Sequence, residues 1–209
     1  MISSLKEVTR TRILEAARKE FFRLGFEEAN MREIADLAQV STSNIYNYFQ
    51  NKEHLLSEIL SPILKGLEVG FQYISQPNYI AKRLADSFED WRERFDLLLN
   101  YIASNREDFQ LLLLKTKGSE LEGLEEKTKL RASKIYIEHF HSYARDNPEY
   151  SGQFSEFVIH NLVSFFLNIF IEMIRQDRTV EEMERDKEML LKFLHSGFRG
   201  AMESNSEAK

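Results

Sequence analysis

The chain of 209 residues contains no cysteine, only three prolines and only eight glycines. The absence of cysteine excludes disulfides, thiolate nucleophiles and cysteine-based zinc sites, and it agrees with a reducing cytoplasm. The scarcity of proline and glycine leaves long stretches without helix breakers. Since 43% of the residues are hydrophobic and 30% are charged, we expect a folded, soluble, mostly helical protein with one large or two smaller domains.

The chain also lacks the motifs of the common enzyme classes. It contains no phosphate-binding loop, no Gly-x-Gly-x-x-Gly, no Gly-x-Ser-x-Gly elbow and no His-Glu-x-x-His pair. His139 and His141 are two residues apart on a predicted helix, so they point to different faces and do not chelate one ion together. We therefore expect no catalytic residue, no metal and no cofactor. A helical enzyme is the weaker alternative.

Positive charge is concentrated at the N-terminus, although the net charge is -6. Residues 1–24 carry six basic side chains against three acidic ones, whereas residues 61–209 carry 20 basic and 25 acidic ones. The basic residues of the first segment are Lys6, Arg10, Arg12, Arg18, Lys19 and Arg23. Because a local patch governs phosphate contact, the acidic total does not exclude a nucleic-acid partner.

One apolar stretch, Phe157–Ile174, is long enough to be considered as a membrane span. His160, Asn161, Ser164 and Asn168 interrupt it, and such groups are costly in a bilayer. The first residues, Met1-Ile-Ser-Ser-Leu-Lys, do not resemble a secretory signal. We expect a cytoplasmic protein without a membrane partner.

The most informative stretch runs from Met31 to Phe49. It predicts two short helices joined by a tight turn, the first beginning after Asn30 and the second, near 42–48, beginning after Ser41. Asn30 with Glu33 forms a capping-box-like pair, and Val40 with Ile45 has the spacing of a hydrophobic staple. The second helix carries no charge and is rich in Ser, Thr, Asn and Tyr. This composition suits a helix that lies against base edges.

Helical periodicity covers almost all of the remaining chain, which predicts an all-α fold. A helix over about 8–24 has an apolar stripe of Leu14, Ala17, Phe21 and Leu24, broadened by Ile13 and Phe22, with Gly25 as its C-terminal cap. The second helix's inner face consists of Ile34, Leu37 and Ala38. Further helices are expected from Lys52 to about Gly66–Gly70, with Pro62 inside, and near 79–103, 107–116, 121–145, 153–176 and 180–201.

Residues 9–60 resemble the N-terminal domain of TetR-family transcriptional regulators. The matching pieces are Ile13-Leu-Glu-Ala-Ala17, Phe21-Phe-Arg-Leu-Gly-Phe26, Met31-Arg-Glu-Ile-Ala35, Val40-Ser41, Ile45-Tyr46-Asn-Tyr-Phe49 and Asn51-Lys-Glu-His-Leu55. The resemblance implies a helix-turn-helix DNA-binding domain over 1–51 and a helical effector-binding and dimerisation domain over 52–209. Two positions depart from the family: Gln39 stands where Gly is common at the turn, and Ser43 where Gly or Ala is common.

The resemblance places a set of polar side chains on the DNA-facing surface. These are Arg32, Thr42, Ser43, Asn44, Tyr46, Asn47, Tyr48 and Lys52. The Asn side chains suit adenine edges, while Thr42 and Tyr46 suit a thymine methyl group or a phosphate. Ser41 and Asn51 are interpreted as helix caps, and Ile45 and Phe49 as core.

The C-terminal three-quarters of the chain carries two further predictions. Candidates for an effector pocket are Phe71, Phe88, Trp91, Phe95, Tyr101, Phe109, Tyr136, His139 and Phe140, although aromatic residues at helical spacing are more often plain core. Candidates for a dimer interface are Phe157, Phe165, Phe166, Phe170, Met189 and Phe193, since two apolar helices suit a four-helix interface.

The sequence thus predicts a ligand-responsive transcriptional repressor that binds a palindromic DNA operator as a homodimer. A small apolar or amphipathic effector releases it. Repression is implied by family tendency alone. The alternative is a helix-turn-helix bundle that contacts proteins without DNA.

Overall fold

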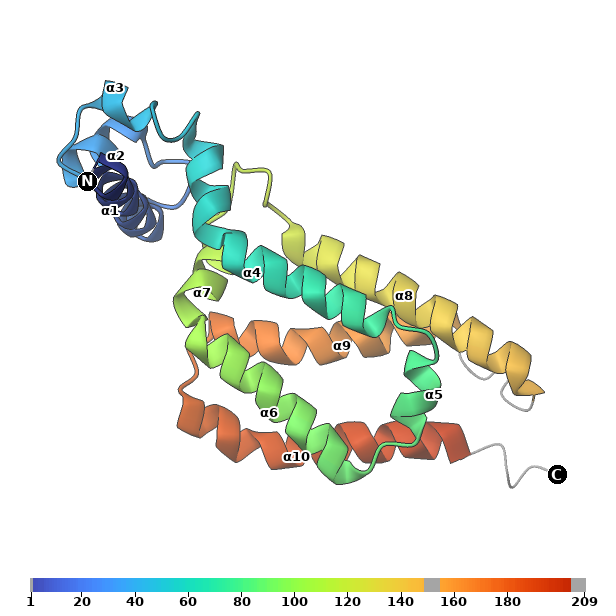
Figure 1. Ribbon diagram of the computed structural model, residues 1–209. Coiled ribbons are helices and arrows are strands. Elements are labelled where there is room, and N and C mark those ends of the chain that lie inside the picture. The colour runs from blue at the N-terminus through green and yellow to red at the C-terminus, as the bar shows by residue number, and fades with distance from the viewer. Residues whose placement is uncertain (1, 149–154, 204–209) are drawn as a thin grey trace. The chain divides into compact units, whose positions relative to one another are not determined.

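The computed structural model describes residues 2–148 and 155–203, within which the chain forms ten α-helices and no strand (Figure 1). The predicted all-α fold is confirmed. The helices are α1 (Ile2–Leu24), α2 (Met31–Leu37), α3 (Thr42–Ile45), α4 (Lys52–Ile74), α5 (Tyr79–Leu84), α6 (Phe88–Ser104), α7 (Arg106–Leu114), α8 (Leu124–Asp146), α9 (Glu156–Arg175) and α10 (Val180–Glu203).

The helices form two compact units. Unit 1 comprises residues 1–67 and 106–124, and unit 2 comprises residues 68–105 and 125–209, so α4 contributes residues to both. The functional boundary expected between residues 51 and 52 remains a prediction.

The helix expected over 79–103 is two helices, because the chain turns at Ala85–Ser87. Ser87 and Asp90 close a capping box: the Asp90 N–H donates to Ser87 Oγ over 3.2 Å, and the Ser87 N–H donates to Asp90 Oδ2 over 2.7 Å. Residues 153 and 154 of the helix expected over 153–176 lie outside the described residues. Ser155 caps α9 through the Val158 N–H.

In unit 1, the predicted core stripe of α1 is confirmed except at its end. Ile13, Ala17 and Phe21, one helical turn apart, are fully buried, whereas Leu24 is 39% exposed. Leu14 is only half-buried. The prediction for Leu24 was wrong, because the buried i, i+4, i+8 row of Ile13, Ala17 and Phe21 ends at Phe21.

The inner face of α2 also differs at one position. Ile34 and Ala38 are buried as predicted, but Leu37 is 53% exposed and Ala35 is fully buried instead. Helix α2 packs against α1 and α3, and two of the three residues buried here, Ala35 and Ala38, are small. Small residues permit the close approach of helices.

Unit 1 is completed by the first part of α4 and by α7. Leu55, Leu56, Leu60 and Ile63 of α4 are fully buried, and so is Leu111 of α7. The Phe26 N–H donates to the carbonyl of Lys115 over 2.7 Å, and Arg18 pairs with Asp108. These bonds hold α7 and the residue after it against α1 and the loop that follows α1.

In unit 2, α9 contacts α6 on one side and α8 on the other (Figure 1). The Phe95 and Phe170 ring centroids are 4.9 Å apart, and Arg175 pairs with Glu125. Lys187 joins α10 to α6: its Nζ lies 2.7 Å from Asp96 Oδ1, with 9% of the residue exposed. A lysine so buried requires a carboxylate partner.

Among the described residues, one helix is long and apolar enough to cross a membrane, namely α9. Its polar groups have partners: His160 Nδ1 lies 3.0 Å from Ser133 Oγ, and Asn161 Nδ2 donates to the Phe157 carbonyl over 2.7 Å. Ile159, Phe170, Met173 and Ile174 pack inside unit 2.

Candidate nucleic-acid interface

The turn between α2 and α3 depends on a left-handed residue. Gln39 has φ of +55°, and its N–H donates to the Asp36 carbonyl over 3.1 Å. The Val40 N–H then donates to the Ala35 carbonyl over 3.0 Å. Gly adopts this conformation without strain, whereas Gln carries a Cβ that crowds it. The departure from the family's Gly therefore places strain at the turn.

Both helices of the motif are capped as predicted. The Asn30 side chain accepts from the N–H groups of Arg32 and Glu33 over 3.1 and 3.0 Å, and Ser41 Oγ accepts from the Asn44 N–H over 3.2 Å. Asn51 caps α4 in the same way, through the His54 N–H at 2.8 Å. These caps satisfy donors that the first helical turn leaves unpaired.

Regular α-helix in the second helix ends at Ile45, three residues before the predicted end. The chain continues in tighter turns, with the Tyr48 N–H donating to the Ile45 carbonyl over 2.8 Å and the Asn47 N–H to the Asn44 carbonyl over 3.1 Å. Ile45 is fully buried and Phe49 is 1% exposed, as expected for core residues. These two buried side chains attach the short segment to the core of unit 1.

Ile45 and Phe49 face inward, and the polar side chains of the segment face outward. Tyr46 is 52% exposed, Ser43 and Asn47 are exposed, and Thr42, Asn44 and Tyr48 are half-buried. Asn47 Nδ2 donates to Asn44 Oδ1 over 3.3 Å, so the two amides lie side by side. Each keeps groups that are free to bond a base edge.

Three of the six basic residues in residues 1–24 form ion pairs with acidic side chains. Arg10 pairs with Glu58, Arg18 with Asp108, and Arg23 with Glu20. Hydrogen bonding to Glu20 raises the pKa of the Arg23 guanidinium. Among the described residues, no ion pair is made by Lys6, Arg12, Lys19 or Arg32. These four cations are therefore available for phosphate contact.

Lys52 has a structural role that sequence reasoning missed. Its Nζ donates to the carbonyls of Glu27 and Ala29 over 3.1 and 2.8 Å and lies 4.4 Å from the centre of the Phe26 ring. An ammonium has three donors, so one is left for a phosphate. Its predicted DNA contact remains a prediction.

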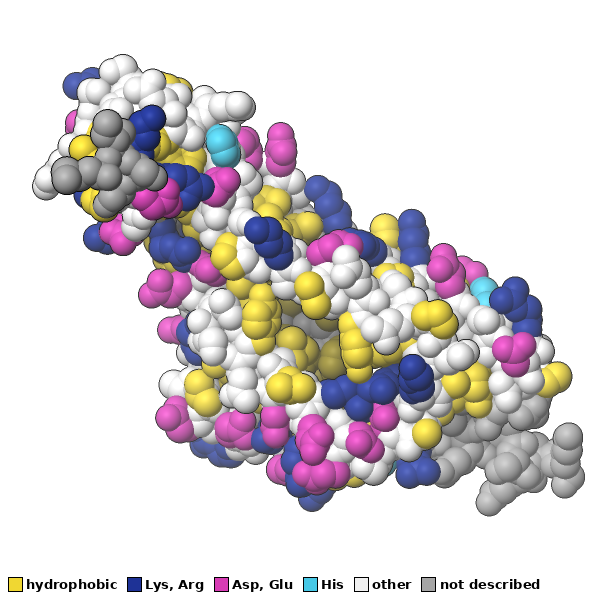
Figure 2. Space-filling model, viewed as in Figure 1, with side chains coloured by type: hydrophobic (Ala, Val, Ile, Leu, Met, Phe, Trp, Pro, Cys, Tyr) yellow, Lys and Arg dark blue, Asp and Glu magenta, His cyan; other side chains and the backbone are white. Residues whose placement is uncertain are grey.

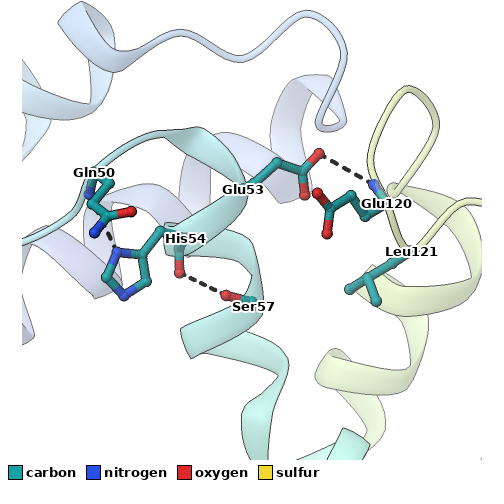
Figure 3. Close-up of a pocket in the computed structure, with 6 residues that line it drawn as sticks. All are labelled: Gln50, Glu53, His54, Ser57, Glu120 and Leu121. Atoms are coloured by element: carbon teal, nitrogen blue, oxygen red, sulfur yellow. Dashed lines mark hydrogen bonds between the residues drawn. The ribbon is translucent and has the colours of Figure 1, made fainter.

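A cavity of about 400 Å³ opens in unit 1 beside the first turns of α4 (Figure 3). Its lining consists of Gln50, Glu53, His54, Ser57, Glu120 and Leu121. His54 Nδ1 accepts from the Gln50 N–H over 3.2 Å, and Glu53 Oε1 accepts from the Glu120 N–H over 3.2 Å. None of the predicted effector-pocket residues lines this cavity.

The predicted pocket residues are distributed over several ring clusters. Phe88 and Trp91 of α6 contact His195 of α10, with ring centroids 5.5 and 5.7 Å apart. Phe95 contacts Phe170, as described above. The Phe71 ring lies 3.9 Å from the Arg131 guanidinium carbon. Tyr101 and Phe140 are half-buried.

Two predicted pocket residues hold polar contacts, and one lies in the other unit. Tyr136 Oη lies 3.2 Å from Tyr79 Oη, and His139 Nε2 lies 2.7 Å from the Ile74 carbonyl oxygen. Phe109 is 8% exposed and belongs to unit 1, so it does not share a compact unit with the other candidates. Whether any of these residues contacts an effector remains a prediction.

Helices α9 and α10 present an exposed apolar surface, which we call the α9–α10 face. Its members, with exposed fractions, are Phe157 (77%), Leu162 (51%), Phe165 (44%), Met189 (72%) and Phe193 (67%). The Phe165 and Phe193 rings lie 6.1 Å apart, so the two helices share this face. Phe170 does not belong to it, because the residue is 5% exposed and its ring packs against Phe95 in the core.

Comparison with known proteins agrees with this architecture. Residues 13–59 match the family described as bacterial regulatory proteins, tetR family. The chain is 43% identical over 56 residues, 27% of its length, to the uncharacterized HTH-type transcriptional regulator YhgD of Bacillus subtilis. It is 34% identical over 106 residues, 51% of its length, to the HTH-type transcriptional repressor SCO4008 of Streptomyces coelicolor. The matches span 29% and 48% of those two relatives.

The fold as a whole resembles that of a solved structure. NalD of Pseudomonas aeruginosa, described as the secondary repressor of the MexAB-OprM multidrug efflux pump, is 24% identical, with a TM-score of 0.58. The alignment covers 91% of this chain and 97% of NalD. At this identity the likeness establishes the fold alone.

Proposed function

The chain belongs to the TetR family of bacterial regulatory proteins, and from that premise we propose that it is a cytoplasmic repressor that binds a palindromic DNA operator as a homodimer. The observation that carries the proposal is the uncharged outer surface of residues 42–48, with its paired amides and exposed Tyr46. Such groups suit base edges in a major groove, and the unpaired cations of unit 1 suit the flanking phosphates.

The DNA-binding part is tested by a double substitution. An operator is first selected from a random duplex pool. We expect Asn44→Ala with Tyr46→Ala to abolish binding to it, while the helical signal and oligomeric state are unchanged. Asn100→Ala, which removes an exposed amide from α6, is the control and retains binding. Unchanged affinity in the double variant contradicts the recognition-helix assignment.

Salt dependence separates DNA binding from a protein-contact role. Neutralised phosphates release counterions, so the operator affinity falls steeply with rising salt. If the pool yields no bound duplex at low salt, a helix-turn-helix module that contacts proteins becomes the better interpretation.

Dimerisation is proposed through the α9–α10 face. Burying one such side chain contributes roughly 1.5–3 kcal/mol to the free energy of dimerisation. In a two-fold symmetric dimer each substitution is present in both subunits, so its effect occurs twice. We expect Met189→Glu to weaken the dimer by about 100-fold or more. Leu97→Glu is the matched control, because Leu97 of α6 is 71% exposed against 72% for Met189 but lies outside the face. Equal sedimentation of the two variants as dimers contradicts the assignment.

The response to an effector is proposed to pass through α4. A small apolar or amphipathic molecule bound in unit 2 shifts this helix and so changes the spacing of the two recognition helices, which must match successive major grooves about 34–36 Å apart. The coupling requires only that the effector binds the two states with different affinities. A tight-binding effector that leaves operator affinity unchanged contradicts this part of the proposal.

A further inference from the structure

Four polar side chains of unit 2 form a group that we call the phenol cluster: Tyr73 of α4, Tyr79 and Arg83 of α5, and Tyr136 of α8. The Tyr73 and Tyr79 ring centroids are 5.6 Å apart, and those of Tyr79 and Tyr136 are 5.8 Å apart. The Arg83 guanidinium carbon lies 5.4 Å from the centre of the Tyr79 ring. These residues come from three helices and meet at one place.

The phenol cluster has more hydrogen-bond donors than acceptors. Tyr79 and Tyr136 share one hydrogen bond of 3.2 Å, so only one of their two hydroxyl hydrogens is used. Arg83 Nη1 donates to Tyr73 Oη over 3.3 Å, which leaves the Tyr73 hydrogen as well. Among the described residues, neither remaining hydrogen has an acceptor.

Neighbouring groups do not remove this surplus. His139 Nε2 is engaged with the Ile74 carbonyl at 2.7 Å, a contact in which the ring nitrogen donates. Burial raises the pKa of Tyr136 well above its ordinary value and also raises that of Tyr79. Both phenols therefore keep their hydrogens at neutral pH and act as neutral donors.

Two guanidinium groups and two carboxylates lie beside the phenol cluster. Asp86 pairs with both Arg83, at 3.2 Å from Nε, and Arg94, so two guanidinium groups share one carboxylate. Asp90 is nearby, but its Oδ2 already accepts from the Ser87 N–H and hydroxyl over 2.7 and 2.6 Å. The charges of Arg83 and Arg94 are thus balanced by Asp86 and Asp90, and what an incoming anion meets is an excess of hydrogen-bond donors beside two guanidinium groups.

Access and an apolar surrounding are both present. Tyr73 is 42% exposed and Tyr79 is 9% exposed, so the cluster runs from the surface into the interior. Hydrophobic side chains gather around a hollow on the face of unit 2 in Figure 2, where Figure 1 draws α9 between α4 and α6. Helices α4 and α5, which carry Tyr73 and Tyr79, border this part of the unit.

We propose that the phenol cluster binds the carboxylate of an amphipathic organic acid, whose apolar part occupies the hollow. The carboxylate accepts the two unused hydroxyl hydrogens and lies beside Arg83, while it offers no donor that would compete with those already present. Binding of this acid does not depend on the proposed function. Only its role as the effector rests on that function.

The test compares three ligands of the same chain length on the full-length protein: decanoate, decanol and decylamine. We expect titration calorimetry to show decanoate binding at least tenfold more tightly than decanol, and decylamine binding most weakly. A hydrogen bond to a charged group is worth roughly a tenfold or greater change in affinity. Tyr79→Phe with Tyr136→Phe is expected to reduce decanoate affinity at least tenfold and to reduce decanol affinity much less, because a bond to a neutral hydroxyl oxygen contributes less than one to a carboxylate.

The double variant keeps the shape of both rings and removes both partners of one hydrogen bond, so its melting temperature stays close to that of the wild type. Tyr143→Phe, about two helical turns further along α8, is the matched control and retains decanoate binding. Equal affinities for the three ligands, an unaffected double variant, or no decanoate binding each overturns the inference. If the same preparation still binds the operator, the proposed regulatory function stands although the carboxylate site is refuted.

If the pool yields no operator while decanoate binding follows the pattern above, the site is correct and the regulator assignment fails. The two hypotheses are therefore separable. Both hypotheses are supported if decanoate releases the operator from the wild type and if the double variant needs an at least tenfold higher decanoate concentration for the same release.

Discussion

The left-handed turn at Gln39 predicts a stabilising substitution. A residue with a Cβ in this region costs roughly 1–2 kcal/mol relative to its preferred conformation, and Gly loses about 0.5–1 kcal/mol more backbone entropy than Ala. The side chain of Gln39 is exposed, and the two backbone bonds of the turn do not involve it. Gln39→Gly should therefore stabilise the protein by about 0.5–1 kcal/mol.

Two matched variants isolate the cause. Gln39→Ala removes the same polar side chain but keeps the Cβ, so we expect almost no gain. Glu15→Gly introduces glycine at an exposed position in the middle of α1 and should cost about 1 kcal/mol. The order of stability is then Gln39→Gly above wild type and Gln39→Ala, with Glu15→Gly lowest.

The assay is thermal unfolding followed by circular dichroism, at one fixed protein concentration because a dimer's melting point depends on it. For a chain of this size, 1 kcal/mol shifts the melting temperature by about 2–4 °C. We expect a rise of about 2 °C for Gln39→Gly. If Gln39→Gly and Gln39→Ala melt together, or if the glycine variant melts below wild type, the strain argument is refuted.

Two further predictions concern ion contacts. Lys52→Met leaves the carbonyls of Glu27 and Ala29 without their donor. Because the first bond is exposed and the second part-buried, we expect a loss of about 1 kcal/mol in urea unfolding, which Lys52→Arg partly restores. A loss confined to operator affinity would contradict the structural role. Hydrogen bonding to Arg131 lowers the pKa of Glu68, so this pair stabilises the folded state above the ordinary pKa of Glu, and the contribution is lost as pH falls through the lowered value. The stability difference between wild type and Arg131→Gln should thus shrink on acidification, and a difference that grows would reverse the assignment.

The helix caps were predictable because they are local. Asn30, Ser41 and Asn51 each bond to backbone groups two or three residues away, and such bonds depend on residue type and spacing alone. The break before α6 was missed although Ser87 and Asp90 have cap-box spacing, because the apolar periodicity on both sides hid a turn of three residues.

Burial was less predictable, since it depends on neighbours that are distant in the chain. Leu24 and Leu37 have the residue type of a core side chain but are exposed, while the small residue Ala35 is buried. Phe170 was assigned to an interface from its place on α9, and its partner Phe95 lies 75 residues earlier in the numbering, within the packed core. An amphipathic stripe indicates that a helix has an inner face but does not specify what covers it.

The sequence alone determined that the protein is helical, that residues 31–49 form a helix-turn-helix, and that an uncharged polar surface lies on its second helix. These properties follow from periodicity, caps and composition, all of which act over a few residues. The tertiary structure decided which cations are already paired, that Lys52 binds two carbonyls 23 and 25 residues away, and that Tyr79 meets Tyr136. Each of these depends on chain segments far apart in sequence, whose meeting only the packed helices bring about.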